Sequence, residues 1–233
     1  YRLSLAALLV VGLVGCSEEE PEPGASNCAP APTTDSTLYL LPLGDSRVQG
    51  YHPHFEAYRY ALWKLFVEGR RPVDFIGTRK DEAAYPPVDS LCFDTDHEGT
   101  GGATTADILA TLGEIHLQAP PDVVTLGIGG NDLLLGTPAQ AALDTLDAIL
   151  QALHSLNDSL LICVEQIAPA RSDVFTPPLA ARFAAYNAGI PAVAAARSTA
   201  SQPVIVVDMR PGWRDAYMAD EVHYNEAGAR VVA

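Results

Sequence analysis

The chain has 233 residues, a length that suits one domain of ordinary size rather than two independent cores. Acidic residues number 29 against 14 basic residues, and the formal charge of −15 repels the phosphates of nucleic acids, which are therefore not expected partners. Hydrophobic residues make up 48% of the chain, which excludes a disordered protein, and no apolar run after residue 15 is long enough for a polytopic membrane protein.

The N-terminal segment resembles the signal peptide of a bacterial lipoprotein. Residues 3–14 form an apolar stretch after Arg2 that is too short for a comfortable membrane span, and small residues lead from it into Cys16, the order that lipoprotein processing enzymes read. We expect residues 1–15 to be removed and Cys16 to become the acylated first residue of a protein anchored by lipid in the bacterial cell envelope, facing the periplasm or the exterior. An ordinary secretory signal with a chance cysteine is the alternative. Because the sequence does not begin with Met, we also expect residues upstream of it.

An acidic tether is expected between the lipidated cysteine and the folded domain. Residues 16–36 contain five acidic residues, no basic residue and several prolines, a composition typical of a solvated linker. The expected limits are therefore 1–15 for the signal peptide, 16–36 for the tether and 37–233 for the folded domain.

Three cysteines remain once Cys16 is acylated, so at most one disulfide can form. Cys163 lies in the apolar run 160–164, which indicates a buried strand in which a thiol behaves as a small hydrophobe. Cys28 and Cys92 are then the better pair, and an oxidising envelope compartment permits the bond. The alternative, in which these two cysteines stay reduced, is open at this point.

From residue 37 onward, short apolar runs alternate with longer helical patterns, which predicts a parallel sheet covered by helices on both faces. The predicted fold class is α/β, a three-layer α/β/α sandwich with a five-stranded parallel sheet. The strands are expected at 38–43, 73–76, 123–128, 160–167 and 204–207. The helices are expected at 54–68, 105–116, 138–156 and 178–198, with a last short helix from Asn225.

Polar residues follow the strands where a parallel sheet forms its functional cleft, beyond the carboxyl ends. Gly44-Asp45-Ser46 follows the first strand and can present a hydroxyl at the sheet edge, or Asp45 and Ser46 can simply cap the next helix. Asn131 follows the third strand, and its side-chain amide can donate to an oxyanion or belong to a turn. After the fifth strand, Asp220 stands three residues before His223, close enough for the carboxylate to orient the imidazole.

Residues 96–104 read as a Gly-rich loop that runs into a helix, with backbone N–H groups that suit an anion. The loop lacks the Gly-Lys-Ser/Thr ending of a phosphate loop. His97 and Glu98 in this loop can brace it or take part in chemistry.

Together these residues resemble the four blocks of the SGNH (GDSL-like) hydrolase superfamily. The blocks are Gly44-Asp45-Ser46, Gly102, Gly130-Asn131-Asp132 and Asp220-x-x-His223. The segments 74–78, 96–99 and 129–134 are similar to the acetylxylan esterases of carbohydrate esterase family 3. The resemblance implies a flavodoxin-like SGNH hydrolase fold for 37–233 and a carboxylic ester hydrolase.

The resemblance also implies a role for each residue. Ser46 is the expected nucleophile, His223 its base and Asp220 the group that orients the imidazole, a Ser-His-Asp triad acting through an acyl-enzyme. The oxyanion hole would consist of the Ser46 and Gly102 N–H groups and the Asn131 amide. The implied reaction removes O-acetyl groups from a carbohydrate. A lipase-like or thioesterase-like acyl hydrolase is the alternative, and a non-enzymatic envelope lipoprotein is a third.

No metal or cofactor is expected. His52 and His54 are close in sequence, but two side chains without a third ligand are typical of a surface loop. Tyr51, Trp213 and Tyr224 adjoin the expected site in sequence and can stack on sugar rings or pack in the core.

Overall fold

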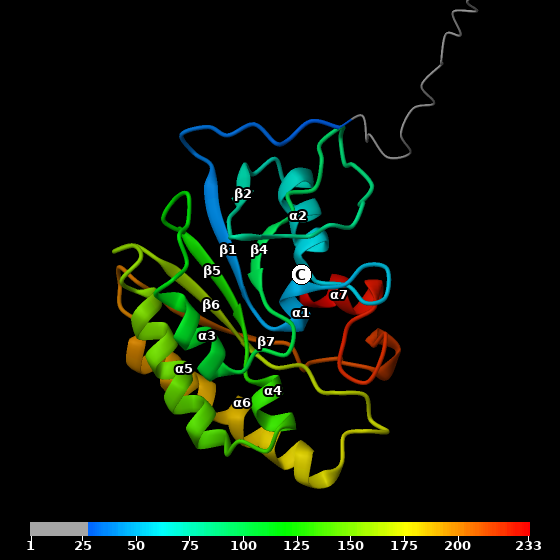
Figure 1. The fold of residues 1–233 in the computed structure, drawn as a ribbon, viewed down its shortest axis with the longest axis vertical. Coiled ribbons are helices and arrows are strands. Elements are labelled where there is room, and N and C mark those ends of the chain that lie inside the picture. Colours follow the sequence, from blue (N-terminus) through cyan, green and yellow to red (C-terminus); the bar gives the residue numbers. More distant parts are fainter. Residues whose placement is uncertain (1–27) are drawn as a thin grey trace, which may run out of the picture.

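Parallel pairing around β1 organises the sheet. β1 (Leu38–Gly44) pairs with β5 (Val123–Gly127), and the parallel order continues through β6 (Leu161–Gln166) to β7 (Val204–Asp208). The computed structural model describes residues 28–233 (Figure 1). The expected signal peptide, the lipidation site Cys16 and the tether up to residue 27 lie outside the described residues.

The other side of β1 carries strands that the sequence analysis foresaw only in part. β2 (Val73–Phe75) pairs with the first half of β1, and β4 (Asp96–Gly99) pairs with its end. β3 (Arg79–Lys80) lies antiparallel to β4. The five predicted strands are confirmed, but the described sheet has seven strands and is mostly rather than wholly parallel.

The prediction of a loop over all of 96–104 is wrong for its first four residues, which form β4. Two polar side chains of this strand, His97 and Glu98, are buried, and each has a partner. His97 Nδ1 accepts the N–H of Gly99 at 2.9 Å, and the Glu98 carboxylate accepts the N–H of Thr78. Such a strand lacks the apolar signal on which strand prediction depends.

Helices cover both faces of the sheet (Figure 1), and among the described residues none is long and apolar enough to cross a membrane. One face carries α3 (Thr105–Leu112), α4 (Gly130–Leu134), α5 (Ala139–Leu153) and α6 (Pro177–Arg197). The other face carries α1 (Ser46–Gln49), α2 (Arg59–Glu68) and α7 (Glu226–Val232), with the short helix η1 (Asp215–Tyr217) before α7. The larger core lies against α5 and α6, where Leu146, Leu150 and Ile190 are fully buried.

The helix predicted from residue 54 begins at Arg59 instead. The preceding backbone is used in tertiary pairing, because the N–H of Glu56 donates to Tyr224 O at 2.8 Å. The buried Arg59 guanidinium then donates to Val48 O at 2.8 Å and to Gln49 O at 2.7 Å, which fixes the first turn of α2 against α1. Such tertiary pairing cannot be predicted from the local sequence.

A disulfide joins Cys28 to Cys92, with the Cα atoms 5.0 Å apart, as the sequence analysis expected. The chain around it is also paired, since Cys92 N–H donates to Ala29 O at 2.8 Å. Residues 28–36, the described part of the expected tether, therefore begin against the segment that precedes β4. Cys163 is a free, partly buried thiol in β6.

Replacing both Cys28 and Cys92 with serine should lower the free energy of unfolding by about 2–4 kcal/mol, because the unfolded chain regains the entropy of a closed loop. Urea denaturation without reductant measures the difference. Added reductant should bring the parent to the level of the variant and leave the variant unchanged. Equal stabilities without reductant would contradict a stabilising disulfide.

Candidate active site

The turn after β1 is set by two glycines. Gly44 pairs with Gly127 in the sheet, and a Cβ on Gly44 would lie 2.0 Å from Gly127 O, so no side chain fits there. Asp45 then caps α1, because its Oδ1 accepts the N–H of Arg47 at 2.9 Å. Capping by Asp45 leaves the neighbouring Ser46 hydroxyl available at the carboxyl edge of the sheet, so the two interpretations of this segment are compatible.

The structure brings Ser46, His223 and Asp220 into one chain of hydrogen bonds. His223 Nε2 lies 2.8 Å from Ser46 Oγ, and His223 Nδ1 lies 2.7 Å from Asp220 Oδ2. The other oxygen of Asp220 accepts the backbone N–H groups of Val222 and His223, each at 2.8 Å. Phe55 stacks on the imidazole with ring centroids 3.9 Å apart. The histidine is thus held by a carboxylate at its edge and an aromatic ring on its face.

The pKa of Asp220 lies below its usual value. Partial burial alone would raise it, but the hydrogen bonds from the His223 ring and from the two backbone N–H groups together lower it. Asp220 is therefore a carboxylate at neutral pH, the form that can hold the protonated ring nitrogen of His223.

Three hydrogen-bond donors lie at the same edge. Within the described residues, the N–H groups of Ser46 and Gly102 donate to no acceptor, and Gly102 has a φ of +75°. Asn131 Nδ2 donates one hydrogen to Ala103 O at 2.9 Å, which fixes the amide beside the Gly102 turn. The second hydrogen of that amide has no acceptor among the described residues. An oxyanion placed here would find three N–H groups without intramolecular partners.

Arg47 was not predicted as part of the site. Its buried guanidinium donates from Nε to Val222 O at 2.7 Å and from Nη1 to Ala168 O at 2.8 Å, and it lies over the Tyr224 ring. The residue after Ser46 therefore binds the residue before His223. The only sequence signal for a role of Arg47 in the site is its position next to Ser46.

Glu165 on β6 is the second residue that the sequence analysis missed. Its side chain is buried, and its carboxyl oxygens lie about 3 Å from where a Cβ on Gly127 would stand. Burial, helped by the nearby Asp45 and opposed by Arg47, raises the pKa of Glu165 to about 7. The sequence signal that could have pointed to Glu165 is that it is the single acidic residue within the apolar run 160–167.

Other singled-out residues have ordinary partners. His52 Nδ1 lies 2.6 Å from Glu56 Oε1, and His54 stacks on Tyr51 at 4.8 Å between ring centroids. Tyr224 is buried and packs against Trp213, whereas Tyr51 is 61% exposed. No group of three or more metal-ligating side chains occurs among residues 28–233.

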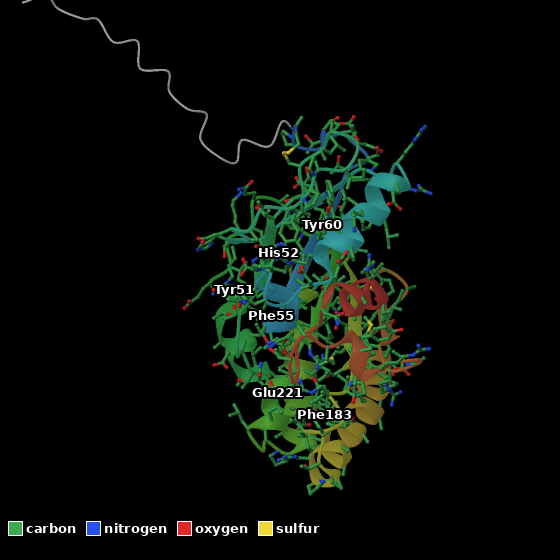
Figure 2. The ribbon with its side chains drawn as sticks, turned by 90° about the vertical axis from the view of Figure 1, so that its right-hand side faces the viewer. Tyr51, His52, Phe55, Tyr60, Phe183 and Glu221 are labelled. Carbon is green, nitrogen blue, oxygen red and sulfur yellow. A yellow bond between two sulfur atoms is a disulfide. The ribbon has the colours of Figure 1, made fainter. Side chains whose placement is uncertain are left out.

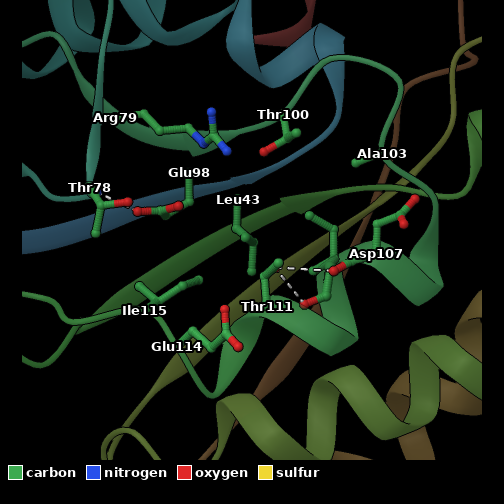
Figure 3. Close-up of a pocket in the computed structure, with 11 residues that line it drawn as sticks. Leu43, Thr78, Arg79, Glu98, Thr100, Ala103, Asp107, Thr111, Glu114 and Ile115 are labelled. Carbon is green, nitrogen blue, oxygen red and sulfur yellow. Dashed lines mark hydrogen bonds between the residues drawn. The ribbon is translucent and has the colours of Figure 1, made fainter.

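Two cavities lie on opposite sides of β4. One, of about 200 Å³, is bounded by Glu98, Ala103 and α3, with Asp107 and Thr111 on its helical wall (Figure 3). The other, of about 400 Å³, is bounded by residues 49–52, residues 80–83 and His97. Because successive side chains of a strand point to opposite faces, Glu98 lines one cavity and its neighbour His97 lines the other.

The raised pKa of Glu165 predicts a pH-dependent effect of Glu165→Gln. Between pH 4.5 and about 7, folded Glu165 keeps a proton that the unfolded chain releases, so its contribution to stability falls as pH rises. Glutamine removes this penalty. We compare the free energy of unfolding of the variant with that of the parent at each pH. This difference should favour the variant by on the order of 3 kcal/mol more at about pH 8 than at about pH 4.

Urea denaturation at both pH values tests this expectation. Glu68→Gln, at an exposed position at the end of α2, is the matched control and should show no such difference. The same stability change for Glu165→Gln at both pH values would contradict a proton held by Glu165.

Known proteins resemble this chain in sequence and fold. Residues 43–231 match the GDSL-like Lipase/Acylhydrolase family. A mutant acetyl esterase solved with an acetate ion has a TM-score of 0.71 and 24% identity, covering 84% of this chain and 92% of that chain. A carbohydrate esterase family 3 protein from Talaromyces cellulolyticus has a TM-score of 0.69 and 24% identity, covering 84% and 92%. The Clostridium thermocellum family 3 carbohydrate esterase has a TM-score of 0.67 and 26% identity, covering 84% of this chain and 91% of that chain.

A comparison with curated proteins found no match. The family match spans most of the described domain, and the neighbours share its mostly parallel sheet flanked by helices. The expected resemblance and the α/β fold class are therefore confirmed. The chain belongs to the GDSL-like lipase/acylhydrolase family, with the SGNH hydrolase fold.

Proposed function

We propose that this member of the family is a serine esterase that removes O-acetyl groups from a carbohydrate. The observation that carries the proposal is the hydrogen-bonded chain from Ser46 through His223 to Asp220 at the carboxyl edge of the sheet. The similarity to an acetyl esterase and to two family 3 carbohydrate esterases supports the acetyl group and the carbohydrate.

In the proposed reaction, Ser46 Oγ attacks the ester carbonyl while His223 Nε2 takes the hydroxyl proton. Asp220 keeps the imidazole oriented and stabilises its charged form. His223 then donates this proton to the departing sugar oxygen as its bond to the carbonyl carbon breaks, which frees the sugar hydroxyl and leaves an acetyl group on Ser46. Water, deprotonated by His223, releases acetate and regenerates the serine. The Ser46 and Gly102 N–H groups and the Asn131 amide would bind the oxyanion in both halves of the reaction.

A lipase-like or thioesterase-like hydrolase remains the second candidate, and such an enzyme needs an apolar cleft for a long acyl chain. One mostly apolar cavity among the described residues lies against Trp63, Phe66 and Val73, beside the amino end of β2. Ser46 lies at the carboxyl edge, where the nearby cavities carry polar side chains. This arrangement supports a short acyl group.

We further propose that the enzyme is exported and anchored by a lipid on Cys16. The small residues before Cys16 and the acidic segment after it support this placement. The Cys28–Cys92 disulfide supports an oxidising compartment. The expected limits of signal peptide, tether and hydrolase domain are part of the same proposal.

Asn131→Ala should lower kcat by about 10²–10³-fold, because one of three oxyanion donors is removed. The loss of its bond to Ala103 O should cost only about 1 kcal/mol of stability. Steady-state kinetics with an acetyl ester and urea denaturation measure the two effects. Asn157→Ala is the matched control, since it also removes an amide-to-backbone bond, to Pro121 O, away from the site. Parent activity in Asn131→Ala would contradict the oxyanion assignment.

Chromogenic acetyl, butyryl and octanoyl esters, together with acetylated xylan, test the substrate class. We expect acetyl to be hydrolysed faster than octanoyl, acetylated xylan to release acetate, and Ser46→Ala to lose all of these activities. A preference for octanoyl would exclude the deacetylase and favour the lipase-like candidate. Activity that survives in Ser46→Ala would exclude the proposed nucleophile.

A further inference from the structure

The larger cavity beside β4 adjoins the proposed reaction centre on two sides. Its wall includes residues 49–52, and Gln49 stands only three positions after Ser46, at the other end of the four-residue helix α1. The Gln49 side-chain oxygen lies 2.9 Å from where a Cβ on Gly101 would stand, next to the proposed oxyanion donor Gly102. A group bound in this cavity would therefore lie beside an ester that reacts at Ser46.

Aromatic rings form the second connection between cavity and reaction centre. Tyr51 on the cavity wall lies 6.0 Å from Phe55 between ring centroids, and Phe55 stacks on His223. Tyr51, His52 and Phe55 lie close together along one side of the molecule (Figure 2). His54 stacks on one face of the Tyr51 ring, and the rest of this 61% exposed side chain offers apolar surface at the cavity for packing against a sugar ring.

The His97 ring presents a fixed hydrogen-bond donor. His97 is 3% exposed and lines the cavity, and its Nδ1 accepts the N–H of Gly99 at 2.9 Å. Burial, together with the nearby Arg59, lowers the pKa of His97 to about 3, so the ring is neutral at neutral pH. A neutral imidazole that accepts at Nδ1 carries its hydrogen on Nε2. Within the described residues, this Nε2–H has no acceptor.

The Nε2 atom is not fully enclosed, so water in the cavity can accept its hydrogen, and an acceptor on a ligand can take the place of that water. Two of the three charged side chains on the wall have partners. Lys80 Nζ pairs with Asp96 at 2.9 Å, and Asp81 pairs with Arg59 at 3.0 Å. The third, Glu82, is exposed and acidic, so the cavity offers an anion no unpaired positive charge and suits a neutral ligand beside an aromatic face. Its volume of about 400 Å³ lies within the range of about 300–1,000 Å³ typical of small-ligand sites.

We propose that this cavity is a sugar-binding subsite in which His97 Nε2–H donates a hydrogen bond to a hydroxyl or ring oxygen of the acetylated carbohydrate. The inference rests on the proposed function and adds to it a location and a specificity-determining residue. His97 touches the sugar rather than the reacting ester, so it governs which esters bind well and takes no part in proton transfer.

Two substitutions separate the two nitrogens of His97. His97→Asn keeps an oxygen near the Nδ1 position, where it can accept the Gly99 N–H, but removes the donor at Nε2. His97→Gln carries an N–H donor near the Nε2 position and gives up the Nδ1 acceptor. The readout is kcat/KM for an acetylated xylo-oligosaccharide divided by kcat/KM for p-nitrophenyl acetate, which contains no sugar.

We expect His97→Asn to lower this ratio about fivefold to tenfold, mainly through KM for the oligosaccharide, and His97→Gln to restore most of it. His116→Asn, at an exposed position after α3, is the matched control and should keep the parent ratio. Because a general loss of folding affects both substrates alike, the ratio isolates the sugar contact.

The outcomes distinguish the two proposals. An unchanged ratio in His97→Asn, in an enzyme whose parent deacetylates the oligosaccharide, would overturn the subsite alone. A low ratio in both His97 variants would also overturn it, because the donor would then not be the cause. A parent that hydrolyses p-nitrophenyl acetate but no acetylated glycan would overturn the proposed function, and the subsite with it.

Discussion

The candidate site depends on one buried guanidinium. Arg47 follows Ser46 on α1 and binds the carbonyl oxygen of Val222, the residue before His223, although the two residues are 175 positions apart in sequence. A second bond to Ala168 O anchors the same side chain to the segment after β6. The planar guanidinium carries five donors in a fixed arrangement, so it can hold two carbonyl groups at once, which a lysine cannot do with the same geometry. This contact ties the segment that carries His223 to the helix that carries Ser46.

Two acidic side chains are buried near the positive charge of Arg47. Asp45 and Glu165 are both buried near Arg47, and burial raises the pKa of each. Two ionised acids here would repel one another, and a proton held by Glu165 relieves this repulsion. Gly44 and Gly127 let the strands and the Glu165 carboxyl approach closely beneath the turn that carries Ser46. The same packing that presents the serine thus creates a buried acid with a pKa near neutrality.

Elements with a local sequence signal were predictable. The five apolar strands and the positions of Ser46, Asn131 and His223 after strand ends were all predictable, because parallel strands bring their carboxyl ends to one edge. β4 was missed because its buried side chains are polar, with His97 satisfied by the Gly99 N–H in the same strand and Glu98 by the Thr78 N–H, 20 residues away. α2 begins late because Glu56 pairs with Tyr224 across the fold. The roles of Arg47 and Glu165 were missed for the same reason, since their partners lie on other elements.

His97 illustrates how the structure resolves an open alternative. The sequence allowed bracing or chemistry, with bracing at least as well supported, and the structure shows bracing at Nδ1 and leaves Nε2 for the proposed sugar contact. Nδ1 braces β4 through the Gly99 N–H, while Nε2 faces a cavity beside the proposed nucleophile. Tyr51 and Tyr224, which were equivalent in sequence, likewise separate into an exposed ring and a buried one.

The central claim is that His223 activates Ser46 as a nucleophile. A fluorophosphonate reacts covalently with an activated serine hydroxyl, so peptide mass spectrometry after labelling tests the claim directly. The account predicts one modification, on the peptide that contains Ser46, and its loss in His223→Asn. Labelling of a different serine, or undiminished labelling of Ser46 in His223→Asn, would contradict it.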